Sequence, residues 1–166
     1  NEGGVPGLYA EKRTDFYPND GQLASVVDRL AQIPLEFEPG SRWEYSVSFD
    51  VLGRLIEVIS GKPLDVFLKD QIFAPLGMED TGFFVPESKQ GRFVSLYQYT
   101  PQDRLVLMES AAGSPLTGPV ETLSGGGGLV SALKDYFRFT EMLRNNGSLD
   151  GHRLLGRKSV ELMTCN

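Results

Sequence analysis

The chain has 166 residues, of which 40% are hydrophobic and 23% charged, and its formal net charge is −6. A chain of this length buries roughly 70% of its unfolded surface in one compact domain, and this composition excludes a disordered or fibrous protein. The sequence contains no run of five or more Lys and Arg residues. Because nucleic acids and anionic membranes bind clustered positive charge, we expect neither as a partner.

A single cysteine and a single histidine restrict the chemistry. Cys165 cannot form an internal disulfide, and His152 cannot form a two-histidine zinc motif. We also expect no metal and no organic cofactor. His152 lies in a hydrophilic turn, where we expect a solvated side chain rather than a member of a Ser-His-Asp triad. No apolar stretch approaches 18 residues. The sequence fits both a cytoplasmic chain and one that is exported and processed.

Three helices are predicted in the first half of the chain, over residues 22–33, 48–60 and 64–74. We expect Asp20 to cap the first helix and Pro34 to end it. Gly61 is placed for the left-handed cap of the second. Apolar residues recur with the helical period and predict buried faces made of Leu23, Val26, Val27, Leu30 and Ile33, then Leu52, Leu55, Ile56 and Ile59, then Leu64, Phe67, Leu68 and Ile72.

The second half begins with β-type sequences and ends with helices. Three short segments, "TGFFV", "RFVSLYQY" and "RLVLM", are rich in β-branched and aromatic residues, which predicts two or three strands. A helix follows over residues 131–145, with a predicted buried side of Leu133, Tyr136, Phe137, Thr140 and Leu143 and with Gly147 near its cap. "SLDGHRLL" predicts a tight hairpin, and a last helix is expected near 158–164.

Two local patterns have both a structural and a functional interpretation. Ser131 and Lys134 match Ser-x-x-Lys, in which an amine one helical turn away takes the proton of a nucleophilic serine. We expect Ser131 instead to be the N-cap of its helix, and Lys134 to lie on a solvated face. The run Gly125–Gly128 fits either a flexible loop or a closely packed segment next to the site, whose backbone could line a phosphate or approach a ligand.

Two long stretches carry a resemblance to a known family. They are "EFEPGSRWEYSVSFDVLGRLIEVISGKPLDVFLKDQIFAPLGMEDTGF" and "SGGGGLVSALKDYFRFTEMLRNNGSLDGHRLLGRKSVELM". Together they resemble the serine β-lactamase-like superfamily of class C β-lactamases, penicillin-binding DD-peptidases and related carboxylesterases. The resemblance implies the helical region of the β-lactamase/transpeptidase-like fold, which is mainly α with a few short antiparallel strands (an α+β class).

The resemblance also implies the site residues. Tyr45 falls on the family's catalytic tyrosine, which handles the proton of the attacking serine together with a lysine. A phenol of pKa about 10 needs a nearby cation for this role; the alternative is an aromatic side chain packed under the Pro-Gly turn beside Trp43. Val47, Gly126 and Gly127 fall at substrate-binding positions. Val47 replaces an asparagine that would bind a substrate amide, which favours esters over β-lactams.

Two motifs of the family have no match here. No Ser-x-x-Lys precedes Tyr45, and no Lys-Thr-Gly or equivalent follows the glycines. We therefore expect residues 1–166 to form a single domain or fragment of a longer hydrolase, inactive alone, with the nucleophile helix and final sheet strands outside it. The expected partners are a small ester or lactam substrate and the remainder of the parent hydrolase. The alternative is a non-catalytic module that binds peptidoglycan fragments or a protein partner.

Overall fold

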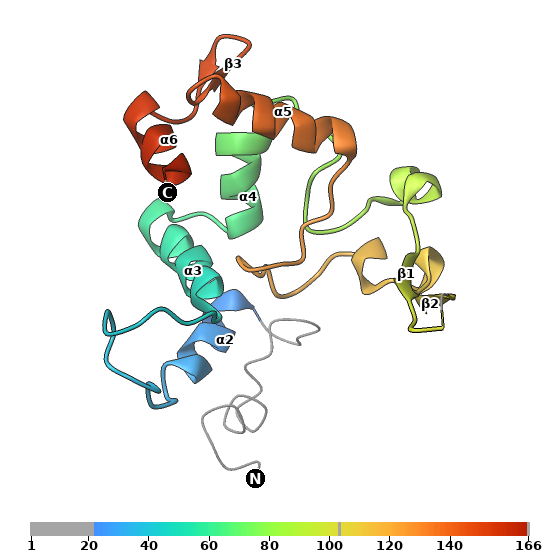
Figure 1. Ribbon diagram of the computed structural model, residues 1–166, viewed down its shortest axis with the longest axis horizontal. Coiled ribbons are helices and arrows are strands. Elements are labelled where there is room, and N and C mark those ends of the chain that lie inside the picture. Colours follow the sequence, from blue (N-terminus) through green and yellow to red (C-terminus); the bar gives the residue numbers. More distant parts are fainter. Residues whose placement is uncertain (1–21, 103, 166) are drawn as a thin grey trace.

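A computed structural model describes residues 22–102 and 104–165 (Figure 1). Its main helices are α2 (Leu23–Leu30), α3 (Ser48–Ser60), α4 (Leu64–Leu68), α5 (Leu133–Arg144) and α6 (Arg157–Thr164). Two antiparallel pairs of strands accompany them, β1 (Leu96–Tyr99) with β2 (Leu105–Glu109) and β3 (Ser148–Leu149) with β4 (His152–Arg153). The predicted class, mainly helical with a few short antiparallel strands, is confirmed.

Two small hydrophobic clusters form the core of the described residues. The first consists of Leu23, Val26, Leu64 and Phe83, and the second of Phe73, Leu76, Met78 and Met142. Leu68 of α4 packs against both clusters. The chain continues from α4 into a π-helical turn, Lys69–Phe73, which carries the predicted third helix to the second cluster. The α4 segment therefore joins the part of the molecule built on α2 and α3 to the part built on α5.

Most of the predicted element boundaries are correct to within a few residues. The second helix matches residues 48–60, and Gly61 adopts the left-handed conformation with φ 68°. The first helix is shorter than predicted because it ends at Leu30, although Ile33 beyond it is buried. Its predicted cap, Asp20, lies outside the described residues. The hairpin predicted from "SLDGHRLL" is formed by β3 and β4.

The predicted buried faces of α3 and α5 are only partly correct, because Ile56 and Leu143 pack against the core clusters whereas most of the other predicted side chains do not. Side chains predicted to be buried are exposed, including Leu52 at 49%, Ile59 at 77% and Leu133 at 87%. The buried positions of α3 are Asp50 and Gly53, and those of α5 are Asp135 and Met142. In each helix a polar or small residue takes the inward side, and a pattern of apolar residues alone does not detect it.

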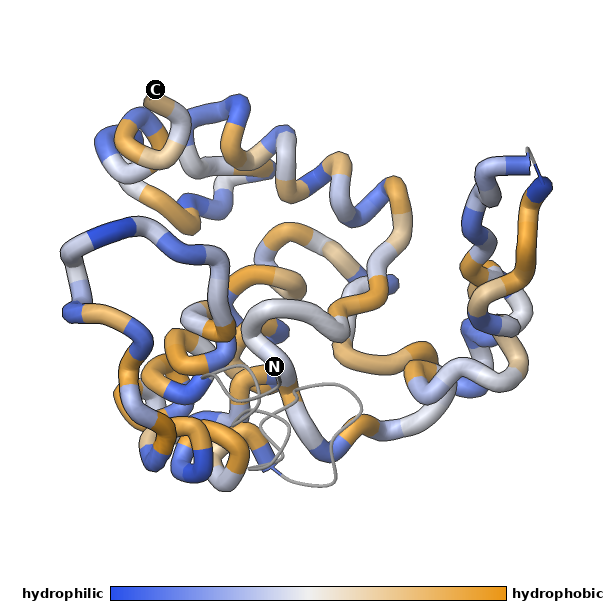
Figure 2. Tube along the Cα trace, turned by 60° about the horizontal axis from the view of Figure 1, so that its bottom comes forward, coloured by the Kyte–Doolittle hydropathy of each residue, from blue (hydrophilic) through white to orange (hydrophobic). Residues whose placement is uncertain are grey.

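The strand predictions for residues 81–109 are correct in two of three segments. β1 and β2 pair in the register Tyr97↔Leu107 and Gln98↔Val106, and they form an arm that stands apart from the helices (Figures 1 and 2). "TGFFV" is instead an irregular segment that makes one isolated bridge, Gly82↔Val130, and then bends at Phe83 and Phe84. This bridge ties the segment after α4 to the segment before α5.

Candidate active site

Tyr45 lies in the loop just before α3, and its side chain is 81% exposed. The neighbouring Trp43 is 83% exposed. The alternative in which Tyr45 is an aromatic packed beside Trp43 is therefore wrong, because neither ring is buried. The phenol is open to solvent two residues before Val47, the N-cap of α3. The catalytic role of Tyr45 stays a prediction.

Val47 is turned toward the protein interior. It is half-buried and packs against the first core cluster, that of Leu23, Val26, Leu64 and Phe83. Its packing fixes the start of α3 relative to α2 and α4. A side chain held in this way offers a substrate only apolar contact. The substrate-binding role predicted for Val47 stays a prediction.

The glycine run is held against the first turns of α3. A Cβ atom at Gly125 would collide with the carbonyl oxygen of Phe49, and Gly125 Cα lies 3.3 Å from the position of a Cβ on Gly53. A Cβ at Gly126 would lie 2.9 Å from Asp50 Oδ2. The run is therefore closely packed against α3, since only glycine fits at Gly125. The approach of its backbone to a ligand stays a prediction.

A buried pair of side chains also connects α3 to the segment that carries the glycine run. Asp50, in the first turn of α3, is 4% exposed, and Ser124 is 8% exposed. The Ser124 hydroxyl donates to Asp50 Oδ1 at 2.5 Å. The Gly126 N–H points to both Asp50 Oδ1 (3.3 Å) and Ser124 Oγ (3.2 Å), and the Gly127 N–H donates to Ser124 Oγ at 3.0 Å.

These bonds limit what Gly126 and Gly127 can offer a substrate. Both amide N–H groups are directed at Ser124 and Asp50, so their carbonyl oxygens and Cα atoms are the groups left for a ligand. Their substrate-binding role stays a prediction. Asp50 and Ser124 were missed by the sequence analysis, although an acidic residue in the first turn of a helix and a serine next to four glycines were the available signals.

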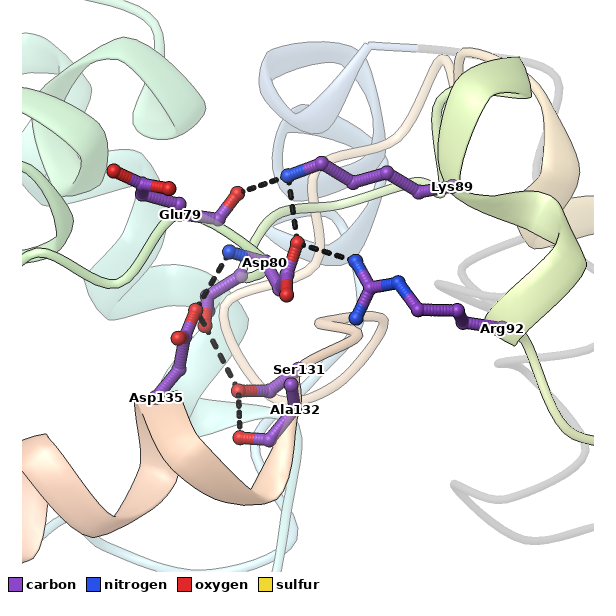
Figure 3. Close-up of polar contacts among 8 residues, drawn as sticks. Glu79, Asp80, Lys89, Arg92, Ser131, Ala132 and Asp135 are labelled. Carbon is purple, nitrogen blue, oxygen red and sulfur yellow. Dashed lines mark hydrogen bonds and ion pairs between the residues drawn. The ribbon is translucent and has the colours of Figure 1, made fainter.

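Ser131 and Lys134, which match the Ser-x-x-Lys pattern, lie at the start of α5. The helix begins at Leu133 with Ala132 as its N-cap, so the prediction that Ser131 caps it is wrong. Ser131 Oγ instead contacts Thr81 Oγ1 at 2.8 Å and donates to the Ala132 carbonyl (Figure 3). Lys134 is exposed, as predicted, and so is His152 in β4. The arrangement gives Ser131 a structural role at the junction of two segments.

A charged cluster lies beside the isolated bridge. Lys89 and Arg92 both contact Asp80 Oδ1 at 2.7 Å, and Lys89 also donates to the Glu79 carbonyl (Figure 3). Hydrogen bonds from Arg92 and then Lys89 hold the pKa of the Asp80 carboxyl well below its usual range. The backbone N–H of Asp80 donates to the buried Asp135 carboxylate at 2.7 Å.

A cavity of about 870 Å³ adjoins this charged cluster. Its lining comes from residues 65–94 and 119–132 and includes Phe83, Phe93 and Leu123 as well as Lys89 and Arg92. Tyr45 and Val47 are not part of that lining. Over the residues with described positions, no group of three or more His, Cys, Asp or Glu side chains could hold a metal ion. No helix in the same residues is long and apolar enough to cross a membrane.

Comparisons with known proteins agree with the fold. Residues 3–166 match the family model described as Beta-lactamase. Protein Rv1367c of Mycobacterium tuberculosis is 40% identical over 81% of this chain and 33% of its own length, and Esterase EstB of Burkholderia gladioli is 34% identical over 76% of this chain and 36% of its own. The solved structure of EstCE1, a hydrolase with promiscuous acyltransferase activity, has a TM-score of 0.66 and 26% identity over 87% of this chain and 40% of its own.

The chain thus spans about a third of the length of the curated relatives it matches. The match of the family model nevertheless extends over nearly all of it. The chain belongs to the Beta-lactamase family, and the resemblance to the serine β-lactamase-like superfamily that its sequence predicted is confirmed.

Proposed function

We propose that this chain is a segment of a longer serine hydrolase that acts on an ester carbonyl through an acyl-enzyme, with Tyr45 in its proton-transfer network. The observation that carries the proposal is the exposed phenol of Tyr45 at the start of α3. By the resemblance of its sequence context, Tyr45 corresponds to the family's tyrosine. The start of α3, which follows it, is packed through Val47 and through the contact with the glycine run.

The proposed reaction has two steps. A serine oxygen, outside residues 1–166, forms a bond to the ester carbonyl carbon, and its proton passes through the tyrosine and lysine to the departing alkoxide as the C–O bond breaks. Water then attacks the acyl-enzyme and releases the carboxylic acid and the serine. Tyr45 needs the cation of that lysine because a phenol of pKa about 10 is otherwise a poor base at neutral pH.

Ester substrates are favoured over β-lactams by two features. Val47 packs against the core and has no group that could hydrogen-bond the amide of a lactam side chain. A site without that donor or acceptor would leave the substrate amide unpaired, which costs affinity. The relative named Esterase EstB, which shares 34% identity with this chain, supports the same substrate class.

The exposed apolar surface supports the proposed remainder of the hydrolase as a partner. α3 presents Leu52, Leu55, Val58 and Ile59 to solvent, and α5 presents Leu133, Tyr136 and Phe137. Exposed apolar side chains gathered on a helix in this way mark an interface. We propose that the rest of the parent chain covers it, and that residues 1–166 alone do not turn over substrate.

The test is acylation of the full-length protein. The protein is mixed with p-nitrophenyl butyrate or with a chromogenic cephalosporin, and both released chromophore and covalent mass are followed. The proposal predicts a burst of nitrophenol and a butyryl adduct with the ester, and much slower turnover of the cephalosporin. Residues 1–166 alone are the matched control and should give neither. A full-length protein that forms no adduct with either substrate would instead support a non-catalytic module.

A further inference from the structure

We propose that Asp50 and Ser124 are positioning residues, which lock the glycine run onto the first turn of α3 and thereby set the position of Tyr45. This inference rests on the proposed function and names two residues that act through Tyr45 rather than on the substrate. It is carried by a buried hydrogen bond of 2.5 Å between residues 74 positions apart in the chain.

The Asp50–Ser124 pair constrains the fold more than an apolar contact would. A carboxylate that is 4% exposed is costly to bury unless its oxygens are satisfied. Asp50 is satisfied by one hydroxyl and one backbone N–H, both from the segment Ser124–Gly126. Replacing Ser124 leaves the buried carboxylate without one donor, and replacing Asp50 leaves the buried Ser124 hydroxyl without this acceptor. The two segments are therefore held in one arrangement.

The Asp50–Ser124 hydrogen bond acts on the helix start that follows the Tyr45 loop. Asp50 lies three residues after Val47, so its carboxylate fixes the first turn of the helix that the Tyr45 loop enters. On the other side Gly125 lies against the Phe49 carbonyl and Gly53, where no side chain fits. The start of α3 is therefore fixed by Val47 from the core and by the glycine run from the opposite segment. The exposed Tyr45 ring is attached to a rigid support.

A second buried aspartate, Asp135, makes a comparable set of hydrogen bonds in a segment that does not contain Tyr45. Asp135 occupies the same third position of α5, is 3% exposed, and accepts from one hydroxyl, Thr81 Oγ1, and one backbone N–H, that of Asp80. It therefore matches Asp50 in its position within the helix, its burial and the kinds of hydrogen-bond donor it binds. The segments that Asp135 joins contain neither Tyr45 nor the glycine run. A substitution of Asp135 therefore distinguishes a general loss of stability from a loss of positioning.

The experiment measures single-turnover acylation of the full-length protein by p-nitrophenyl butyrate, together with Tm. Asp50→Ala, which removes both acceptor oxygens, and Ser124→Ala should lower the acylation rate about 10- to 100-fold, because small displacements of a catalytic group have effects of this size, while KM changes little. The double variant should be little slower than the slower single variant, since both changes remove the Asp50–Ser124 hydrogen bond. Ser124→Thr keeps the hydroxyl and should restore the rate.

Asp135→Ala is the control and should lower Tm as much as Asp50→Ala does while it acylates at the wild-type rate. Equal effects of Asp50→Ala and Asp135→Ala on the rate would overturn the inference. If Asp50→Ala fails to fold, the comparison of Ser124→Ala with Ser124→Thr decides, and equal rates for these two variants overturn it. Wild-type acylation by Tyr45→Phe would overturn the proposed function itself, whereas a slow Tyr45→Phe with a normal Ser124→Ala would overturn this inference alone.

Discussion

At the scale of single residues, Asp80 shows how strongly a partly exposed carboxylate can be held. Its side chain is 27% exposed, and Lys89 and Arg92 both contact the same oxygen. These cations favour the ionised form, which is why the pKa of Asp80 is well below its usual range. The two ion pairs of Asp80, with Lys89 and with Arg92, join the segment after α4 to the helical turn Glu87–Arg92 that leads into the β1–β2 arm.

Asp80→Asn should therefore remove a stabilisation that depends on pH. Because the folded pKa is depressed, the contribution of Asp80 is fully present above the unfolded pKa of about 3.9 and is lost as the pH falls toward the folded pKa. Urea unfolding of both proteins between pH 2 and pH 7 measures it. The stability difference should be constant above about pH 5 and shrink toward pH 2. Arg92→Ala should weaken the same dependence, and a difference that is flat down to pH 2 would contradict this account.

At the scale of elements, α5 shows why its inward side could not be predicted. Asp135, Phe139 and Met142 lie at spacings of four and three residues and face the protein. Asp135 can be buried there because Asp80 and Thr81 donate to it. An analysis that counts only apolar residues places Leu133 and Phe137 inside instead. Long-range hydrogen bonds of this kind are not visible in the sequence, whereas the helix itself and most of its length are.

Met142→Ala and Leu133→Ala form a matched pair that tests this orientation. Met142 is 1% exposed in the second core cluster, so its truncation should destabilise residues 1–166 by about 2–5 kcal/mol. Leu133 is 87% exposed, so its truncation should change stability by no more than about 0.5 kcal/mol. Urea denaturation of the 166-residue chain measures both. The reverse order would restore the buried face predicted from the sequence.

In α3 too, the helix could be predicted from the sequence but its long-range contacts could not. Its bounds and its left-handed cap at Gly61 could be predicted from spacing. The position of Tyr45 before it could be predicted only from family resemblance. The contact of Gly53 with Gly125 and the bond of Asp50 to Ser124 join residues more than 70 positions apart. No local pattern specifies such a contact, so the support of the site became visible only in the structure.

At the scale of the whole molecule, α3 and α5 each expose several large apolar side chains. Ile59 and Leu133 are among the most exposed apolar side chains. The chain also spans about a third of the length of its curated relatives. Burying a side chain such as Ile59 stabilises a protein by about 1.5–3 kcal/mol. The proposed remainder of the hydrolase would gain this energy by packing on α3.

Cysteine labelling tests whether α3 is covered. Ile59→Cys is made with Cys165→Ser, and reaction with a maleimide is followed by mass spectrometry of the peptide that contains residue 59. The label should react quickly in the 166-residue chain, where residue 59 is exposed, and at least tenfold more slowly in the full-length protein, where a partner surface excludes the reagent. Equal rates in the two proteins would show that the remainder does not cover this face.

The most direct test of the central claim is the acylation rate of Tyr45→Phe in the full-length protein. The substitution removes one oxygen from a side chain that is 81% exposed, so Tm should stay within about one degree of the wild type. If the phenol transfers the serine proton, single-turnover acylation by p-nitrophenyl butyrate should fall roughly 10²- to 10⁴-fold. Acylation at the wild-type rate would contradict the account.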